Sequence, residues 1–437
     1  MNQDDPIFLK EFYRRLSDRP LEPGDPLYVH LYGTGIGHPD PVEDLAKGIE
    51  WADTLETAQL FSGFRGTGKS TELRRLKARL EQAGNFKVVL CDMQSYLNLT
   101  WPVDISDFLI AVAGAFSEAL AEDPDLLGKD LSKESYWERL GNFIKKTNIS
   151  IDGLSVGAEG VGVKANLKQD PSFKKTLQDE MKGHLGALSD DVQKYMKSCV
   201  EALKKKHGDE TQVVLLLDSI EQIRGTSVNE KEVYASVETL FQGHSDKLKF
   251  PYIHTVYTVP PWLKIRSPGV AGLYSNSEHL PCIKVRNPDG TPNRQGLDAV
   301  ETLVAKRGDW QRLLGNRETL DKIVSASGGF LRDLFRLLQR CLRQAADAPL
   351  PINDNAVEMA LHHVRNSYLP IATSDAVWLN RVGRTHRAEL AEGERLGDLS
   401  RFFDTHLVLC YRNGEEWYDV HPLIADHVKT LASGEPT

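Results

Sequence analysis

The segment GFRGTGKST, residues 63–71, constrains the fold of this chain more than any other feature. It fits the pattern G-x-x-x-x-G-K-[ST]. A short apolar run at residues 58–62 precedes it, and a helical pattern with Leu73, Leu76 and Leu80 on one face follows it. A glycine-rich loop between a strand and a helix directs several backbone N–H groups, and the positive end of the helix, toward one point. The sequence therefore predicts a binding site for a chain of phosphates.

The residue types of this loop suit a nucleoside triphosphate. The glycines permit positive φ and a close approach of the backbone to the ligand. The ammonium of Lys69 would reach the β- and γ-phosphates, and the Ser70 hydroxyl would hold Mg²⁺. The chain has no N-K-x-D motif that would read guanine, which favours ATP and leaves GTP as the alternative. The cofactors we predict are ATP and Mg²⁺. The residues predicted to contact the nucleotide here are Gly63, Phe64, Arg65, Gly66, Thr67, Gly68, Lys69, Ser70 and Thr71.

Length and composition exclude several classes of protein. A chain of 437 residues is long enough for two or three domains with sizeable cores. Its formal charge of −9 argues against a protein that coats nucleic acid through bulk charge. The five cysteines show no C-x-x-C spacing, which favours reduced thiols over disulfides or a zinc site. The N-terminus lacks an apolar signal core, and the longest apolar stretch, 108–116, is too short to span a bilayer. We expect a cytoplasmic protein without a membrane partner.

Four further apolar runs after the loop predict the strands of an α/β fold. They lie at residues 87–92, 212–218 and 251–259, with a short fifth strand at 282–285. The run 212–218 is continuously apolar, as in a strand that is buried on both faces of a parallel sheet. Helices are expected at 41–51 and from Asp104, as N-cap, to about Leu120. Strands separated by helices indicate a parallel sheet sandwiched by helices.

Residues 125–210 have the character of an insertion in this sheet. Apolar residues alternate with period two over 149–167 around a Glu159-Gly160 turn, which predicts a Gly-rich β-hairpin. Exposed strand edges would let this hairpin mediate self-assembly or the docking of a partner, or else it packs on the following helix. That long helix is predicted from a buried stripe: Phe173, Leu177, Met181, Leu185, Leu188, Val192, Met196, Val200 and Leu203.

The last third of the chain is predicted to be mainly helical and to end in a small α+β module. Helices extend from about 297 to 368, with a break at Gly328-Gly329 before a helix over 330–346. Helices near 374–391 and 396–403 precede two strands, 407–412 and 415–420, which Asn413-Gly414 joins as a hairpin. We therefore expect an N-terminal segment (1–40), a phosphate-binding domain (41–295), a helical lid (296–370) and a winged-helix-like domain (371–437). The run 33–37, GTGIG, is interpreted as a plain turn.

Acidic residues at strand ends are the candidates for metal binding and for water activation. Asp218 ends the run LLLD and would hold Mg²⁺ through water beside Ser70, or else it caps the next turn. Hydrolysis also needs a group that orients or deprotonates the attacking water. Glu221 is the nearest acid, and Asp92, at the end of a neighbouring strand, is the second candidate.

Polar residues farther along have the chain order of phosphate sensors. Thr258, or else Tyr257, ends the strand after Asp218 and would sense the γ-phosphate. The segment SGGFLR opens a lid helix and would place Arg332 near the phosphates, with Arg336 one turn later as the alternative. The candidates for an arginine finger toward a neighbouring subunit are Arg266, our first choice, and Arg224 and Arg286.

This order of motifs resembles the AAA+/STAND group of P-loop ATPases, especially the initiator-like (origin-recognition) branch. The resemblance covers about residues 40–437 and rests on 63–70, on 215–218 and on the G-G-x-x-R pattern ending at Arg332. It implies a sheet ordered 5-1-4-3-2, a helical lid and a nucleotide bound between them. Ser219 departs from the pattern, since many of these ATPases carry an acid there. Turnover is therefore expected to be slow or to await a group supplied by a partner.

Three functions compete on the sequence. The first is an ATP-driven switch that couples nucleotide state to assembly or to a protein effector, in bacterial signalling or defence against mobile elements. The second is a DNA-associated, initiator-like or transposition-type ATPase that uses its winged helix, and the third is a small-molecule kinase. Residues 371–437 hold seven basic and eleven acidic residues, which favours protein contact over groove reading. Other basic runs that would suit DNA are Arg74, Arg75, Lys77 and Arg79, and Lys204 to Lys206.

Overall fold

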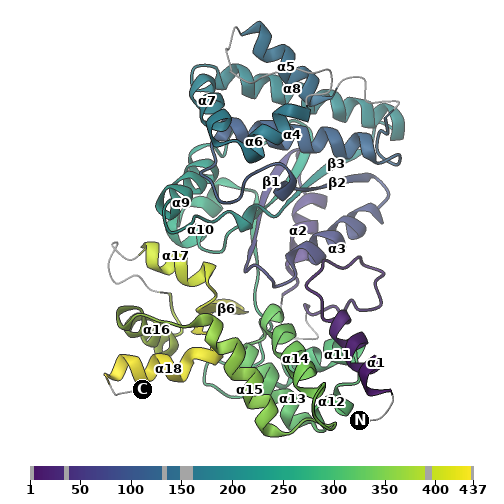
Figure 1. The fold of residues 1–437 in the computed structure, drawn as a ribbon. Helices are drawn as coiled ribbons and strands as arrows, with labels where there is room; N and C mark the ends of the chain where they lie inside the picture. Colours follow the sequence, from purple (N-terminus) through teal and green to yellow (C-terminus); the bar gives the residue numbers. More distant parts are fainter. Residues whose placement is uncertain (1–3, 34–38, 130–134, 148–160, 389–395, 435–437) are drawn as a thin grey trace. The chain divides into compact units, whose positions relative to one another are not determined.

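The computed structural model describes residues 4–33, 39–129, 135–147, 161–388 and 396–434. The chain forms two compact units (Figure 1). The sheet unit comprises Val42–Ser62 and Glu72–His279, and the lid unit comprises Met1–Pro41, Gly63–Thr71 and Leu280–Thr437. The segment GTGIG and the first strand of the expected hairpin, up to residue 160, fall on or across the gaps in the description.

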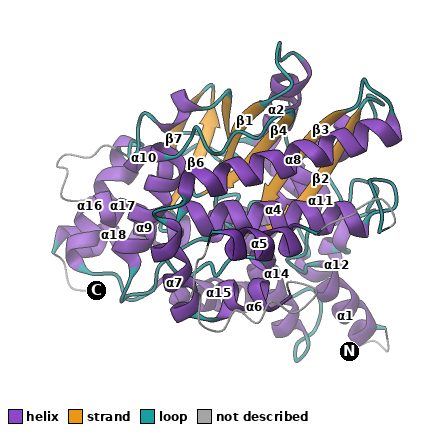
Figure 2. Ribbon diagram, turned by 90° about the horizontal axis from the view of Figure 1, so that it is seen from above, coloured by secondary structure: helices purple, strands orange, loops and turns teal. Residues whose placement is uncertain are grey.

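The sheet unit is built on a five-stranded sheet with the order β2-β3-β4-β1-β5. Its strands are β1 (Thr57–Gly63), β2 (Phe86–Asp92), β3 (Gln212–Asp218), β4 (Ile253–Val259) and β5 (Asn276–Leu280). The pairs β1–β4, β4–β3 and β3–β2 are parallel. Figure 2 shows the strands side by side with helices around them. The predicted α/β class is confirmed, and so is the order implied by the resemblance.

Burial of the central strands explains why these residues form a sheet. Residues 213–217 of β3 are fully buried, as are nearly all residues of β4. Helix α2 (Pro41–Glu50) leads into β1, and α3 (Lys69–Glu81), α4 (Ile105–Glu122), α9 (Glu230–Glu238) and α10 (Leu263–Arg266) lie in the connections between the strands. Leu73, Leu76 and Leu80 of α3 are fully buried, as their spacing predicted.

The prediction for the fifth strand is wrong by about six residues. The strand is Asn276–Leu280 and not 282–285. Polar residues occupy most of β5, which lies at the edge of the sheet, so the apolar run after it gave the stronger signal. That run bonds within the lid unit instead: the N–H of Cys282 donates to the carbonyl of Cys410, and that of Ile283 to the carbonyl of Gly329.

The insertion is helical where the structure describes it. It contains α5 (Tyr136–Lys146), α6 (Val161–Gln169), α7 (Pro171–Met181) and α8 (Leu185–His207). The second strand of the predicted hairpin is therefore wrong, because residues 161–169 form α6. Val163 and Leu167, which α6 buries, are four apart, and this is a helical spacing that the period-two pattern also contains. The predicted long helix is divided into α7 and α8, and its apolar stripe is buried except at Leu185.

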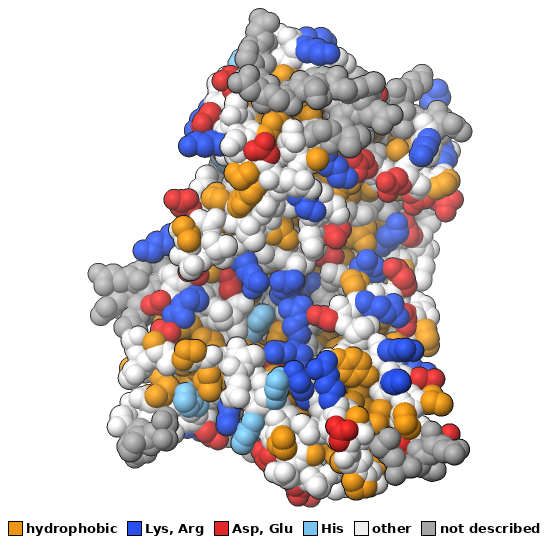
Figure 3. Space-filling view, viewed as in Figure 1, with side chains coloured by type: hydrophobic (Ala, Val, Ile, Leu, Met, Phe, Trp, Pro, Cys, Tyr) orange, Lys and Arg blue, Asp and Glu red, His pale blue; other side chains and the backbone are white. Residues whose placement is uncertain are grey.

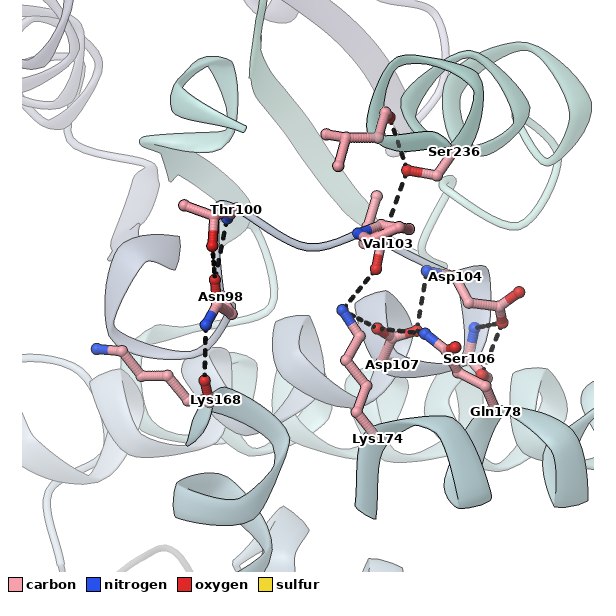
Figure 4. Close-up of polar contacts among 12 residues, drawn as sticks. Asn98, Thr100, Val103, Asp104, Ser106, Asp107, Lys168, Lys174, Gln178 and Ser236 are labelled. Carbon is pink, nitrogen blue, oxygen red and sulfur yellow. Dashed lines mark hydrogen bonds and ion pairs between the residues drawn. The ribbon is translucent and has the colours of Figure 1, made fainter. Parts of the chain in front are cut away.

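A buried ion pair attaches the insertion to α4 (Figure 4). Asp104 caps α4 in a capping box with Asp107, which confirms the predicted N-cap. The Lys174 ammonium of α7 lies 2.9 Å from Asp107 and donates to the carbonyl of Pro102 at 2.7 Å, while Gln178 donates to the same carboxylate. Burial raises the pKa of Asp107 despite the pairing with Lys174. The partners therefore offset only part of the desolvation of a carboxylate that is almost fully buried.

The lid unit surrounds α14 (Leu331–Ala345) with other helices. These are α1 (Asp5–Arg15), α11 (Arg294–Arg307), α12 (Trp310–Leu314), α13 (Arg317–Ser327) and α15 (Asp354–Arg365). The predicted break at Gly328-Gly329 separates α13 from α14. Gly329 has φ +71°, and a Cβ there would lie 1.9 Å from the carbonyl oxygen of Ile283. Only glycine fits this close approach of two backbones.

The C-terminal module contains α16 (Thr373–Thr385), α17 (Leu396–Asp404), β6 (Val408–Asn413), β7 (Glu415–Val420) and α18 (Pro422–Ser433). The strands β6 and β7 pair antiparallel, as the Asn-Gly turn predicted, but Asn413 belongs to β6 and is opposite Glu415. The first module helix ends near 385 rather than 391, and α18 escaped prediction, although Pro422 at its first position is a typical start signal. The module joins the lid where the His421 ring lies 3.2 Å from the buried Asp333 of α14.

Candidate functional site

The loop at residues 63–71 is closed by its own lysine. Lys69 is 3% exposed, and its ammonium donates to the carbonyl oxygens of Gly63 and Phe64, both at 2.8 Å. The carbonyl of Phe64 also accepts from the N–H and the hydroxyl of Thr67. The loop carbonyls thus turn toward Lys69. In the described part of the chain, the N–H groups of Gly66 and Gly68 donate to no protein acceptor.

The lid arginine lies against this loop. Gly66 has φ +97°, and a Cβ there would lie 2.7 Å from Nε and 2.8 Å from Cβ of Arg332. A side chain at residue 66 would therefore displace the arginine as well as strain the backbone. The guanidinium of Arg332 also donates to Asp18 at 2.8 Å. The loop and Arg332 are brought together, as the G-G-x-x-R pattern predicted, whereas Arg336 pairs with Asp333 at 2.9 Å.

An aromatic cluster joins the loop to the C-terminal module. Phe64 is 1% exposed and stacks on Phe403 of α17, with ring centroids 5.5 Å apart at 17°. Its edge meets His406 at 5.8 Å, and His406 stacks on Phe330, the N-cap of α14, at 4.7 Å. Burial, and next the positive charge of Arg332, lowers the pKa of His406 to about 3. Loop, lid and module therefore share one packed cluster.

The N-terminal segment also contacts the loop. The N–H of Leu21 donates to the Thr71 hydroxyl at 3.0 Å, and Asp18 pairs with Arg332. Sequence reasoning missed these contacts and the packing role of Phe64. A phenylalanine at a variable position of the loop pattern was the one available signal, since an aromatic ring there needs a partner to bury it.

In the sheet unit, the predicted acids lie on adjacent strands at the carboxyl edge. Asp218 of β3 is in register with Asp92 of β2. Asp218 is 5% exposed and accepts from the N–H of Ser219 at 2.8 Å, whereas Asp92 is exposed and accepts from the N–H of Gln94. Because parallel strands present their carboxyl ends at one edge, β1 also ends there, with Ser62 in register with Val259.

Thr258 braces the turn that follows Asp218. Its hydroxyl donates to the carbonyl of Leu217 at 3.1 Å and accepts from the N–H of Ile220 at 3.0 Å. The single hydroxyl proton is thus engaged by the protein. Sensing of a γ-phosphate by Thr258 stays a prediction, and the observed bonds give it a positioning role. The alternative sensor, Tyr257, donates to the carbonyl of Leu248 at 2.6 Å.

Ser219 and Glu221 form this turn. Ser219 adopts a left-handed conformation with φ +70°, and residues Ile220–Gln222 form one 3₁₀ turn. A non-glycine residue in this region stores strain, of a kind that is concentrated at functional sites. Glu221 is 8% exposed. The structure therefore places the candidate water-activating acid in a buried turn directly after Asp218.

The arginine-finger candidates differ in their surroundings. Arg266 pairs with Glu238 and covers the ring of Tyr234 at 5.3 Å. Arg286 pairs with Asp419 of the module at 2.7 Å, which ties the chain after β5 to β7. The side chain of Arg224 is exposed. A role for any of the three toward a neighbouring subunit stays a prediction.

Comparisons with known proteins return likenesses of fold at low identity. The chain is similar to the ORC2 protein of Aeropyrum pernix, solved in ADPNP–ADP complexes (12% identity, 96% of each chain covered, TM-score 0.43). It is similar to a Walker-type ATPase of Pyrococcus abyssi (12% identity, 95% of this chain and 99% of that chain, TM-score 0.43). A third likeness is to the Aeropyrum pernix ORC1 protein in complex with DNA (12% identity, 96% of each chain, TM-score 0.39). No protein-family model and no curated protein matches the sequence. Likeness at this level describes what the chain resembles, and its function has to be inferred from its own residues.

Proposed function

We propose that the protein is an ATP-binding and slowly ATP-hydrolysing switch of the AAA+ type, whose nucleotide state is transmitted to its C-terminal module. One observation carries the proposal: the loop that fits a triphosphate is packed at the same time against a lid arginine, through Gly66, and against the module, through Phe64. A ligand that changes the loop must therefore change at least one of these two contacts.

The chemistry of the loop suits a polyphosphate. Lys69 supplies a buried ammonium, and the N–H groups of Gly66 and Gly68 supply donors without protein acceptors in the described chain. The close approach of Arg332 to Gly66 adds a second cation. The sequence motifs assign Mg²⁺ to Ser70 and Asp218, and when bound it would offset charge on the phosphates. These assignments stay predictions.

The switching step follows from the packing of Phe64. Lys69 holds the carbonyls of Gly63 and Phe64. If its ammonium turns to a phosphate, these two bonds are released and the backbone at Phe64 is freed to move. Because packed interiors respond to displacement by shifting between discrete arrangements, the stack of Phe64 on Phe403 would reorganise. The module would then present a different surface to a protein effector or to a second copy of the chain.

Two features of α17 favour a protein-directed module over one that reads a DNA groove. The single basic residue of this helix, Arg401, is paired with Asp375 at 2.9 Å and lies near Asp398. Phe402 and Phe403 are buried, and Phe403 faces the loop. The helix is therefore engaged inside the lid unit. A role in bacterial signalling or in defence against mobile elements fits such a module, and it is part of the proposal.

The test is ATP binding and turnover by Lys69→Ala, with Lys175→Ala as the matched control. Lys175 is an exposed lysine of α7, so it reports the loss of a positive charge elsewhere. We expect Lys69→Ala to lose measurable ATP affinity by calorimetry and to release no phosphate, with unchanged circular dichroism. The control should match the wild-type protein. Retained affinity in Lys69→Ala would refute the assignment of the loop, and transfer of phosphate to an acceptor other than water would favour a kinase.

A further inference from the structure

One face of the lid unit is rich in arginine and poor in acid. Helix α14 carries four arginines and one acid, Asp333, which is fully buried. The side chains of Arg336, Arg340 and Arg343 recur at helical spacing, and α15 adds His362 and His363, both exposed. Figure 3 shows Lys, Arg and His side chains gathered over this part of the molecule. We call Arg336, Arg340, Arg343, His362 and His363 the arginine face.

The N-terminal helix extends this face. Helix α1 packs on α14: Gln339 donates to the carbonyl of Leu16, and the guanidinium of Arg343 bonds the Tyr13 hydroxyl and covers its ring at 5.3 Å. The next residues along α1, Arg14 and Arg15, are exposed. The positive charge is therefore spread over adjacent helices that contact one another, and not along a single helix.

The charges of the face are only partly compensated. Arg336 is tied to Asp333 and to the Ser367 hydroxyl. Among the residues that the structure describes, Arg14, Arg15, Arg340 and Arg343 pair with no carboxylate. Desolvation and then the charges of Arg340, Arg336 and Arg343 lower the pKa of His363, which is the response expected in a positive potential. The nearest acids lie at the border of the face: Glu358 of α15 interacts with His362 and pairs with Lys322, and Glu11 of α1 lies one turn before Arg14 and Arg15. In a chain with a net charge of −9, a face on which arginines outnumber acids is a departure from the rest.

We propose that the arginine face binds the phosphate backbone of duplex DNA without reading its sequence. Guanidinium groups match phosphate oxygens in a bidentate geometry. The arginines from 336 to 343 span about 10 Å of helix at 1.5 Å per residue, a length over which one DNA strand carries about three phosphates. Because α1 and α15 both pack on α14, the helix cannot enter a major groove, so its contacts are to the backbone.

The surface chemistry argues against other polyanions. Single strands bind through exposed aromatic rings, whereas Tyr13 is covered by Arg343 and the Tyr368 hydroxyl is bonded to Asp333. Membrane-surface helices need an exposed apolar stripe, whereas the exposed large apolar residues described on α1, α14 and α15 are Ile7 and Met359 alone. The contact lies on the lid and N-terminal helices, so it is distinct from DNA binding through the C-terminal module.

The test is binding of a labelled 30-base-pair duplex of random sequence, measured by fluorescence anisotropy on the full chain without nucleotide. The variant is Arg340→Gln with Arg343→Gln. The control is Arg381→Gln with Arg384→Gln, two exposed arginines of α16 with the same spacing and the same change of charge. Each lost phosphate contact lowers the slope of log K against log salt by about 0.9. We expect the face variant to bind roughly tenfold to a hundredfold more weakly near 0.1 M salt, with a slope lower by about two.

The outcomes separate this inference from the proposed function. Arg340→Lys with Arg343→Lys should retain most of the affinity, and circular dichroism and ATP affinity should be unchanged in all variants. Equal losses in the control pair would overturn the inference, as would a wild-type protein that does not bind the duplex. Displacement of the duplex by polyglutamate as readily as by unlabelled DNA would show that the face binds an acidic protein instead. Because DNA binding is measured without ATP, the result for the arginine face does not depend on whether the protein binds ATP.

Discussion

Replacing Phe64 by alanine should release the C-terminal module from the loop without abolishing nucleotide binding. The ring is 1% exposed, stacks on Phe403 at 5.5 Å and touches His406 at 5.8 Å. Truncation of a buried phenylalanine costs about 3–5 kcal/mol, of which an aromatic pair accounts for about 0.5–1.5 kcal/mol. The groups that would hold a triphosphate are the Lys69 ammonium and backbone N–H groups, and these are retained in the variant.

Hydrogen exchange of α17 and β6 measures this loss locally, which suits a chain of two units that need not unfold in one step. If about 3 kcal/mol is lost where the module meets the loop, exchange of these amides should accelerate by about two orders of magnitude, at 1.4 kcal/mol per factor of ten. ATP affinity should change by less than tenfold. Phe335→Ala is the matched control, because Phe335 is also buried in the lid unit but packs under Arg307.

Two results would refute this reasoning. Exchange of α17 and β6 at the wild-type rate in Phe64→Ala would mean that the stack contributes no stability to the module. An equal acceleration in Phe335→Ala would mean that any lesion in the lid unit loosens the module, so that the contact between Phe64 and Phe403 has no special role.

Three further predictions concern single residues of the strand ends and of the module. In Asp218→Asn the side chain can still accept from the N–H of Ser219, so the turn should be kept. We expect this variant to retain its ATP affinity when Mg²⁺ is absent, and to release phosphate at least a hundredfold more slowly when Mg²⁺ is present. Turnover at the wild-type rate would exclude a role of Asp218 in binding the metal. Thr258→Val leaves the Leu217 carbonyl and the Ile220 N–H without their bonds and should lower the unfolding free energy of the sheet unit by about 1–3 kcal/mol, whereas Thr258→Ser should restore most of it in denaturant titrations. Because burial and next the charge of Arg332 lower the pKa of His406 to about 3 in the fold, the unfolded chain takes up this proton first as the pH falls below about 6.5. The stability of the module should therefore decline from pH 6.5 toward pH 3, by up to about 2 kcal/mol at pH 5, and His406→Asn, which tolerates the left-handed backbone, should remove that part of the decline.

Local sequence signals were sufficient for four of the five strands of the sheet. The continuous apolar run predicts the strand β3, and the glycine loop predicts that a strand, β1, precedes it and a helix, α3, follows it. The Asn-Gly pair likewise located the β6–β7 hairpin, but the register is shifted by one residue from that of a two-residue turn, because Asn413 lies in β6 opposite Glu415. These elements could be predicted because their residue patterns admit one periodicity, and the turn chemistry at their ends agrees with it.

Elements whose patterns admit two interpretations could not be predicted. Residues 161–167 alternate with period two but also place Val163 and Leu167 four apart, and tertiary packing selected the helix. The edge strand β5 is too polar to be recognised without knowledge of its neighbour β1. Pairing across long separations in sequence, such as Phe64 with Phe403 or Arg332 with Asp18, leaves no periodic trace at all.

The residues of the candidate site also divide into those that the sequence predicted and those that it did not. The loop followed from its spacing, and the closeness of Arg332 to it from the chain order of the motifs and from the resemblance. The bonds of Thr258 did not, because a threonine at a strand end has the same sequence signature whether it senses a ligand or braces a turn.

The most direct test of the account is hydrogen exchange of the wild-type protein with and without saturating ATP. We expect ATP to protect residues 63–71 and, in the same experiment, to change the exchange of α17, which Phe64 of the loop contacts through Phe403, and of the following strand β6. Protection of the loop with no change in α17 and β6 would show that ATP binds but is not transmitted to the module. That result would refute the proposal that the nucleotide state of the loop is transmitted to the C-terminal module.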